Sequence, residues 1–250
     1  MNPIVRIQNL THRFPDGTLG LDGITLSVEE GAFVVIAGAN GSGKTSLLRH
    51  LNGLLRPTSG TVEVAGVSVT ENPRQARVLV GMVFQDADGQ IVGETVGEDV
   101  AFGPENLKLP RPEVDRRVAT ALASVGLAHL SAKRPHLLSG GEKRRLAIAG
   151  VVAMQPRVIV FDEPFSNLDY AGVREVLAQM VALHRAGRTV LLTTHDLGKV
   201  AAHADRLLIM QAGRIVCDGT PRAALARAET FGVRRPRAAA LGVETLSWLS

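Results

Sequence analysis

A glycine-rich stretch near the N-terminus carries the residue types that hold phosphate groups. It reads GANGSGKT over residues 38–45 and fits the pattern G-x-x-x-x-G-K-[ST]. Glycines permit positive φ and let backbone amides approach phosphate oxygens, and the helix N-terminus that follows favours anions. Lys44 is expected to neutralise the β- and γ-phosphates, and the Thr45 hydroxyl to ligate Mg²⁺. The predicted phosphate-binding residues are Gly38, Ala39, Asn40, Gly41, Ser42, Gly43, Lys44, Thr45 and Ser46.

Two adjacent carboxylates form a second group that could do chemistry. Asp162 and Glu163 come directly after the apolar run VIVF at 158–161. Taken alone, they could be an acidic strand end that caps a helix. Beside a phosphate loop, Asp162 is expected to hold Mg²⁺ and Glu163 to polarise the water that attacks the γ-phosphate. ATP and Mg²⁺ are therefore the predicted substrate and cofactor.

The elements that must position these groups are strands that alternate with helices. Residues 32–37, 157–161 and 189–193 are short apolar runs rich in β-branched residues, which is typical of buried strands. The phosphate loop follows the first run and leads into a segment with helical spacing. This alternation predicts an α/β fold, a P-loop NTPase with a mainly parallel central sheet.

Two further parts of the chain depart from that alternation. Residues 3–8 and 24–28 alternate apolar and polar side chains, and 61–69 reads as an edge hairpin strand, so we expect an antiparallel β subdomain. Another strand is expected at 78–84 and a closing pair at 206–210 and 213–216. The pattern is helical from about 90 to 153, with Pro104, Pro110 and Pro112 as breaks, which predicts an inserted helical subdomain.

Composition limits the classes of partner. The chain has 250 residues and a net charge of +4, and aromatic residues make up only 4%. A nucleic-acid-binding protein would need a concentrated basic stripe with aromatics, so we expect no nucleic-acid partner. A single cysteine, Cys217, excludes an intramolecular disulfide. No signal peptide and no apolar run near the roughly 20 residues of a membrane span are found, so any membrane role is expected to use separate embedded subunits.

The stretch LSGGEKRR at 138–145 has two compatible interpretations. Ser139 and Glu142 have the spacing of a helix capping box. The stretch also resembles the LSGGQ signature of ABC ATPases, with Glu142 where Gln is commoner. That resemblance implies that Ser139, Gly140, Gly141 and Glu142 act in trans, at the γ-phosphate held by a second subunit.

Four more residues resemble landmarks of the same family. Gln85 resembles the Q-loop glutamine that touches Mg²⁺ and links to the membrane partner, and Asp169 resembles the D-loop aspartate. His195 resembles the switch histidine at the γ-phosphate, although a lone histidine at a strand end is usually unremarkable. Phe14 stands where the family stacks an aromatic on adenine; the alternative is a core residue. The resemblance covers about residues 3–220.

Within the family the chain is most similar to the ATPases of energy-coupling-factor (ECF) importers. The stretches VGMVFQDADGQIVGETVGEDVAFGPENL and LLSGGEKRRLAIAGVVAMQP carry this likeness. It implies that residues around 93–102 lie near the groove for the membrane subunit. The D-loop region reads DEPFSNLDY where the group usually has DEPTAGLDP, and the variant resembles the biotin branch.

We therefore expect an ABC ATP-binding domain over 1–220 and a short C-terminal extension over 221–250. The extension holds five Arg and two Glu, and it ends with apolar Leu246, Trp248 and Leu249. It could be a short packed helix with a frayed end, or a contact surface for a partner.

The predicted function is the ATP-hydrolysing subunit of an ECF-type importer for a micronutrient, cobalt or nickel first and biotin second. The alternatives are a subunit of another ABC transporter class or a soluble ABC ATPase without transport. The expected partners are a second ATPase copy, as homodimer or heterodimer, a transmembrane coupling subunit and a substrate-binding membrane subunit. The expected location is the cytoplasmic face of the cell membrane.

Overall fold

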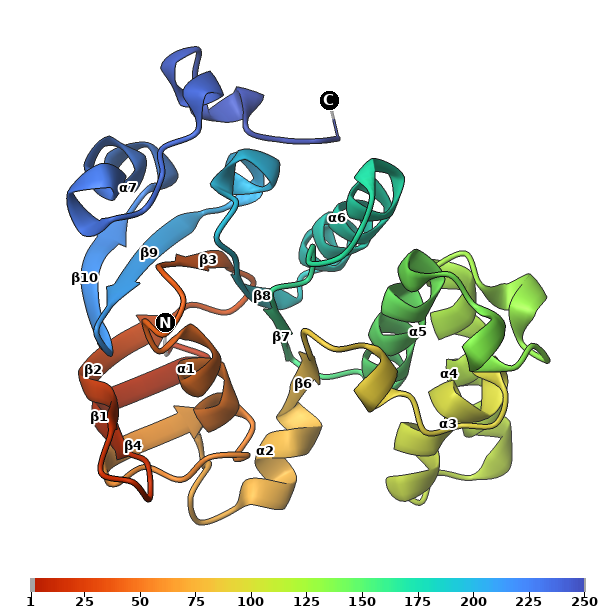
Figure 1. Cartoon of the computed structure of the whole chain (residues 1–250). Helices are drawn as coiled ribbons and strands as arrows, with labels where there is room; N and C mark the ends of the chain where they lie inside the picture. Colours follow the sequence, from red (N-terminus) through yellow and green to blue (C-terminus); the bar gives the residue numbers. More distant parts are fainter. Residues whose placement is uncertain (1–2, 250) are drawn as a thin grey trace.

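The computed structural model describes residues 3–249 as two sheets with helices around them (Figure 1). The smaller sheet is antiparallel, with strand order β2-β1-β4-β5. Its strands are β1 (Val5–Arg13), β2 (Leu19–Val28), β4 (Ser59–Val64) and β5 (Val67–Ser68). Val5 and Ile7 of β1 are buried in the predicted alternation, which shifts by one residue at an irregularity around Asn9 before Leu10 and His12.

The central sheet has the order β10-β9-β3-β8-β7-β6. Its strands are β3 (Phe33–Ala37), β6 (Val80–Val83), β7 (Val158–Asp162), β8 (Thr189–Thr193), β9 (Arg206–Gln211) and β10 (Arg214–Gly219). All neighbours pair in parallel except β9 and β10. Every residue of β3, β7 and β8 is buried, because helices or the other sheet cover both faces. The carboxyl ends of these strands therefore meet at one edge, where the phosphate loop begins.

Two apolar clusters hold the layers together. One joins β3, β7 and β8 to α5 and α6 and reaches into the C-terminal segment. The other packs α1 between the two sheets. The helices are α1 (Lys44–Leu51), α2 (Pro73–Leu79), α3 (Val96–Asn106), α4 (Arg111–Ser124), α5 (Gly140–Ala153), α6 (Tyr170–Arg185) and α7 (Pro221–Arg227). Short 3₁₀ turns are η1 (Asp88–Gln90), η2 (Ala128–Leu130), η3 (Pro135–Leu137), η4 (Leu197–Lys199), η5 (Ala201–His203), η6 (Ala228–Phe231), η7 (Arg237–Ala240) and η8 (Val243–Thr245).

Helices α3, α4 and α5 form a group beside the sheets (Figure 1). Pro110 precedes α4 and Pro112 lies in its first turn, as expected of helix starts. Pro104, in contrast, lies inside α3 and does not end it. Along residues 3–249, no helix is both long enough and apolar enough to cross a bilayer.

The structure corrects three local predictions. Residues 61–69 form two strands, because the chain turns at Ala65 and Gly66, both with positive φ. Helix α2 was not predicted, and β6 is shorter than 78–84 because α2 takes its first residues. The C-terminal end is not frayed as far as residue 249: Leu246 is 1% exposed, and Trp248 and Leu249 pack against the main cluster.

Candidate active site

The glycine-rich loop joins β3 to α1, and its glycines adopt conformations that other residues avoid. Gly38, Gly41 and Gly43 have φ of 156°, 78° and 101°. A Cβ on Gly43 would come within 2.8 Å of the Gly20 carbonyl oxygen. Close packing of the loop against β2 therefore requires glycine at position 43.

The turn between β9 and β10 supports the same loop from the other side. The Gly213 amide donates to the Ser42 carbonyl at 3.0 Å, and the Asp22 amide donates to the Gly213 carbonyl at 3.0 Å. Arg214 adds an ion pair to Asp22 at 2.6 Å. These contacts join the loop, the antiparallel sheet and the central sheet at one point.

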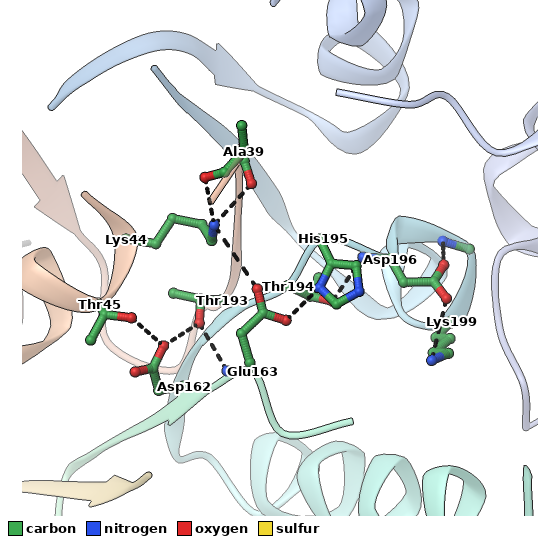
Figure 2. Close-up of polar contacts among 12 residues, drawn as sticks. Ala39, Lys44, Thr45, Asp162, Glu163, Thr193, Thr194, His195, Asp196 and Lys199 are labelled. Atoms are coloured by element: carbon green, nitrogen blue, oxygen red, sulfur yellow. Dashed lines mark hydrogen bonds and ion pairs between the residues drawn. The ribbon is translucent and has the colours of Figure 1, made fainter. Parts of the chain in front are cut away.

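Lys44 is the buried cation of the loop. Its Nζ donates to the carbonyls of Gly38 at 2.8 Å and Ala39 at 3.1 Å, and lies 3.9 Å from Glu163 Oε1 (Figure 2). Burial lowers the pKa of Lys44, while the nearby carboxylates of Glu163 and Asp162 act in the opposite direction. The loop thus keeps an ammonium group where an anion would enter.

Asp162 ends β7 and is 3% exposed. Its Oδ1 accepts hydrogen bonds from the hydroxyls of Thr45 at 2.9 Å and Thr193 at 2.8 Å (Figure 2). Hydroxyl and carboxylate oxygens are ligands that Mg²⁺ prefers. Thr45 and Asp162 therefore fit a magnesium ion bound beside the loop.

Glu163 directly follows β7 and is bonded to the last residue of the neighbouring strand β8. Its amide donates to Thr193 Oγ1 at 3.0 Å, and its backbone has the left-handed φ of 46°. Its carboxylate reaches His195 Nδ1 at 2.9 Å through Oε2, opposite the oxygen near Lys44. The Glu163 side chain is 12% exposed and that of His195 is 67% exposed. The carboxylate is therefore oriented between a cation and a solvent-accessible imidazole.

Phe14 lies on the far side of the loop, in the turn between β1 and β2. Its ring covers Gly20, where a Cβ would come within 2.6 Å of Cε2 of the ring. The His12 ring supports it edge-on, with 4.8 Å between centroids. Phe14 is half-buried and lines the cavity, so it is not the core residue of the alternative interpretation.

One cavity of about 700 Å³ brings most of the predicted residues together. A volume of this size is typical of a small-molecule site. Its lining contains Phe14, the loop from Asn40 to Ser46, Gln85, Glu163 and His195. Gly38, Ala39 and Asp162 do not line the cavity but bond to residues that do. The carbonyls of Gly38 and Ala39 accept from Lys44, and Asp162 accepts from the Thr45 hydroxyl.

The four predicted signature residues and Asp169 do not line this cavity. A neighbouring hollow of about 680 Å³ is lined by Thr45, Gln85, Asp162 and Gly140. Ser139, Gly141, Glu142 and Asp169 line neither hollow. Ser139 and Glu142 form the expected capping box of α5, with the Ser139 amide 2.7 Å from Glu142 Oε2. Asp169 is the N-cap of α6 and accepts from the Gly172 amide at 2.8 Å.

Sequence reasoning missed a contact between the signature helix and the Gln85 segment. Arg144, 4% exposed, donates to the carbonyls of Phe84 at 2.5 Å and Gln85 at 2.6 Å. Lys143 beside it pairs with Asp88 at 2.6 Å. Two adjacent basic residues on α5 therefore hold the segment that presents Gln85.

Other missed residues complete the walls. The Thr193 hydroxyl donates to the Asp162 carboxylate and accepts from the Glu163 amide. Thr193 stands at the end of a predicted strand, but no motif marks it. Thr18, Leu19 and Gly20 also line the cavity, and no motif in the sequence marks them. Ser166 lines it as well, and it lies in the stretch that resembles the D-loop.

Comparison with known proteins gives a consistent family. The sequence model of the ABC transporter family matches residues 21–166. The chain is 44% identical over 244 residues to the energy-coupling factor transporter ATP-binding protein EcfA of Methanocaldococcus jannaschii, covering 95% of this chain and 88% of that one. It is 43% identical over 242 residues to the cobalt import ATP-binding protein CbiO of Rhodobacter capsulatus, covering 94% and 86%.

Solved structures agree with these relatives. The chain matches cbiO1 of Clostridium perfringens, part of the ABC transporter complex cbiONQ, with a TM-score of 0.83, 35% identity and coverage of 96% and 99%. It also matches the cassette MJ0796 in a dimeric post-hydrolysis state with ADP and Pi, with a TM-score of 0.78, 28% identity and coverage of 87% and 98%. With its phosphate loop, carboxylate pair and cavity in one place, the chain belongs to the ABC transporter family as an ATP-binding subunit that hydrolyses ATP.

Proposed function

We propose that this chain is the energy-coupling ATPase of an ECF-type importer for a micronutrient, with cobalt or nickel as the first candidate cargo and biotin as the second. Relatives named as EcfA and CbiO, at 43–44% identity over most of the chain, support the transporter type. The observation that carries the catalytic part is the placement of the Glu163 carboxylate between Lys44 and His195 at the cavity.

The cavity wall suggests how ATP is bound. Phe14 stacks on the adenine, since an aromatic face accepts a flat base. The loop amides and the N-terminus of α1 hold the phosphates, and Lys44 leaves the carbonyls of Gly38 and Ala39 to pair with them. Thr45 and Asp162 hold Mg²⁺, with Gln85 at the rim; the ion, when bound, offsets the phosphate charge.

Hydrolysis then depends on the two residues beyond the loop. Glu163 accepts a hydrogen bond from the attacking water and directs it toward the γ-phosphate. His195 contacts the γ-phosphate and, through its 2.9 Å contact, fixes the orientation of Glu163. Both act by position and charge, which is sufficient for phosphoryl transfer without a covalent intermediate.

A second copy completes the site. Ser139, Gly140, Gly141 and Glu142 begin α5, whose N-terminus offers amide donors to an anion. Ser139 and Gly140 are exposed and Ser139 lies outside the chain's own cavity, so they are free to face the γ-phosphate of a partner. A head-to-tail pair with two-fold symmetry gives two such sites, with Asp169 near the contact. The partner is a copy of this chain or a related ATPase.

The membrane subunits dock on the helical side. A groove of about 480 Å³ is lined by Ile91, Glu94, Arg134 and His136 among others. Val92, between two residues of this lining, is 62% exposed, and Phe102 of α3 is 54% exposed. A transmembrane coupling subunit seated there places the chain on the cytoplasmic face of the cell membrane, and a separate membrane subunit binds the cargo. We assign residues 1–220 to the ATP-binding domain, with the helical subdomain at about 90–153, and 221–250 to the extension.

Glu163→Gln tests the catalytic assignment. ATP binding should remain, and ATP-dependent dimers should persist, because the side chain keeps its size. The hydrolysis rate should fall by about 10²- to 10⁴-fold, the scale for losing an acid–base group. Glu71→Gln, an exposed carboxylate outside the cavity, is the matched control. Parental turnover in Glu163→Gln would remove the assignment of Glu163 as the base.

The transporter type needs a separate measurement. The chain should co-purify with a transmembrane coupling subunit and a substrate-binding membrane subunit, and reconstituted vesicles should take up the cargo only with ATP. Uptake assays with labelled cobalt, nickel and biotin distinguish the cargoes. An ATPase that stays active but joins no membrane subunit would contradict the transport role.

A further inference from the structure

The C-terminal segment ends against the parts of the chain that flank Glu163 and His195. We propose that Trp248 is a positioning residue for ATP hydrolysis: it ties the start of α6 to the segment after His195. The inference deepens the proposed function, since it rests on the roles given there to Glu163 and His195.

The segment that carries Trp248 is anchored by the two residues before it. Leu246 is 1% exposed, and its carbonyl accepts from the Ala202 amide at 3.1 Å. The Ser247 hydroxyl lies 2.7 Å from Nε2 of His203. Figure 1 shows this end of the chain, in dark blue, passing from α7 toward α6. The backbone that carries Trp248 is thus fixed to η5, eight residues or fewer beyond the catalytic histidine in the chain.

The indole touches two separate elements. Its ring lies 5.0 Å from the ring of Tyr170, tilted by 43°. Lys199 Nζ lies 4.9 Å from the indole centroid, within cation–π range. Tyr170 opens α6 directly after Asp169, and Lys199 is in η4, just after His195. Trp248 therefore contacts both the D-loop side and the histidine side of the site.

Lys199 extends this contact to the segment after Glu163. Its Nζ is 5.8 Å from the Phe165 ring and 3.3 Å from Asp196 Oδ2, and its side chain is only 16% exposed. Figure 2 shows Asp196 and Lys199 following His195 along the chain. One partly desolvated ammonium group thus lies between a ring two residues after Glu163 and the ring of Trp248.

The sequence of the D-loop region also supports the proposed role of Trp248. Phe165 and Tyr170 both fall in DEPFSNLDY, and they stand where the usual DEPTAGLDP has Thr and Pro. Of the four positions at which the two stretches differ, these two carry the rings that meet Lys199 and Trp248. The altered D-loop region and the C-terminal extension are therefore parts of one cluster, formed by Phe165, Tyr170, Lys199 and Trp248.

Steady-state ATPase kinetics of the full chain test the proposal. Trp248→Ala should lower kcat by about 10- to 10²-fold, the scale of a small misplacement of catalytic groups. The KM for ATP should stay within about twofold, because no residue of the cluster lines the cavity. Trp248→Phe, which keeps a ring, should recover most of kcat. Leu241→Ala, at an exposed residue of the same extension, should behave as the parent.

The outcomes separate this inference from the proposed function. If Glu163→Gln is inactive while Trp248→Ala turns over at the parental rate, only the positioning role fails. A purely structural role would lower the melting temperature of Trp248→Ala without changing kcat at temperatures where it is folded. If Trp248→Ala does not fold, Lys199→Met is the deciding variant. It should reduce kcat at unchanged KM, and parental kcat in that variant would overturn the proposal.

Discussion

The ammonium group of Lys44 lies 3.9 Å from the carboxylate of Glu163. The same cation donates to two loop carbonyls, so the loop itself supplies hydrogen-bond acceptors for it. In the proposed function, an incoming phosphate replaces those neutral acceptors with charged oxygens and brings the reacting group beside Glu163. Under that proposal, one side chain links binding and catalysis.

Lys44→Ala should weaken ATP binding. A hydrogen bond to a charged group contributes about 1.5–3 kcal/mol, so the affinity should fall by about 10- to 10²-fold. Isothermal titration calorimetry measures this directly, with Lys108→Ala at an exposed site as the control. An unchanged dissociation constant for ATP would show that the loop lysine does not contact the phosphates.

Gly43→Ala should cost more stability than Gly41→Ala. Both residues have positive φ, but a Cβ on Gly43 would lie 2.8 Å from the Gly20 carbonyl, whereas one on Gly41 meets no atom within 4 Å. Gly41→Ala carries only the left-handed strain of about 1–2 kcal/mol. Urea denaturation without nucleotide compares the two free energies of unfolding. Equal values would mean that β2 moves away from the loop at no cost.

Much of the cavity wall could be predicted because its chemistry is local in sequence. Gly38 to Thr45 and Asp162 to Glu163 each combine a buried strand with functional residues at its carboxyl end, and parallel pairing brings those ends together. Helix α2 was missed because seven residues are too few for a clear helical period. The contact of Arg144 with Phe84 and Gln85 joins residues about 60 positions apart. The spacing of apolar residues predicts helices and strands but not which distant residues meet.

The C-terminal segment was left open for a related reason. Leu246 and Trp248 looked alike in sequence, as apolar residues near a chain end. Their partners come from the loops after β7 and β8 and from α6. Whether these two side chains are packed or exposed is therefore decided only when the distant segments come together.

Arg144→Met should destabilise the fold and loosen the Gln85 segment. The substitution leaves two carbonyls without their donor, and each lost bond of this kind costs about 1–3 kcal/mol. Arg111→Met, whose side chain is 72% exposed, should change stability little. Urea denaturation compares the two, and hydrogen exchange at residues 84–90 reports the local effect. A variant as stable as the parent would show that the buried guanidinium is not needed there.

Acid should destabilise the protein through His50 and His203. Burial lowers the pKa of both imidazoles below the ordinary value of 6.5, and the neighbouring His12 adds to the effect at His50. Between the lowered pKa and 6.5 the unfolded chain binds more protons than the folded one, so the free energy of unfolding decreases as pH falls below about 6.5. Above that pH neither histidine contributes a slope.

His50→Gln should reduce this slope, and the exposed His129→Gln should leave it unchanged. Melting temperatures from pH 7.5 to 5.0 measure the difference. The same acid sensitivity in His50→Gln and in the parent would exclude His50 as a source.

The turn between β9 and β10 has a consequence for movement within the subunit. Gly213 bonds to Ser42 on one side and Asp22 on the other, and Arg214 pairs with Asp22. A shear between the two sheets would break both contacts to Asp22, and the bond from Gly213 to Ser42 ties the phosphate loop to the same turn, so we expect the sheets and the loop to shift as one body. In the proposed binding mode, the adenine on Phe14 and the phosphates on the loop therefore rest on a single rigid part of the chain.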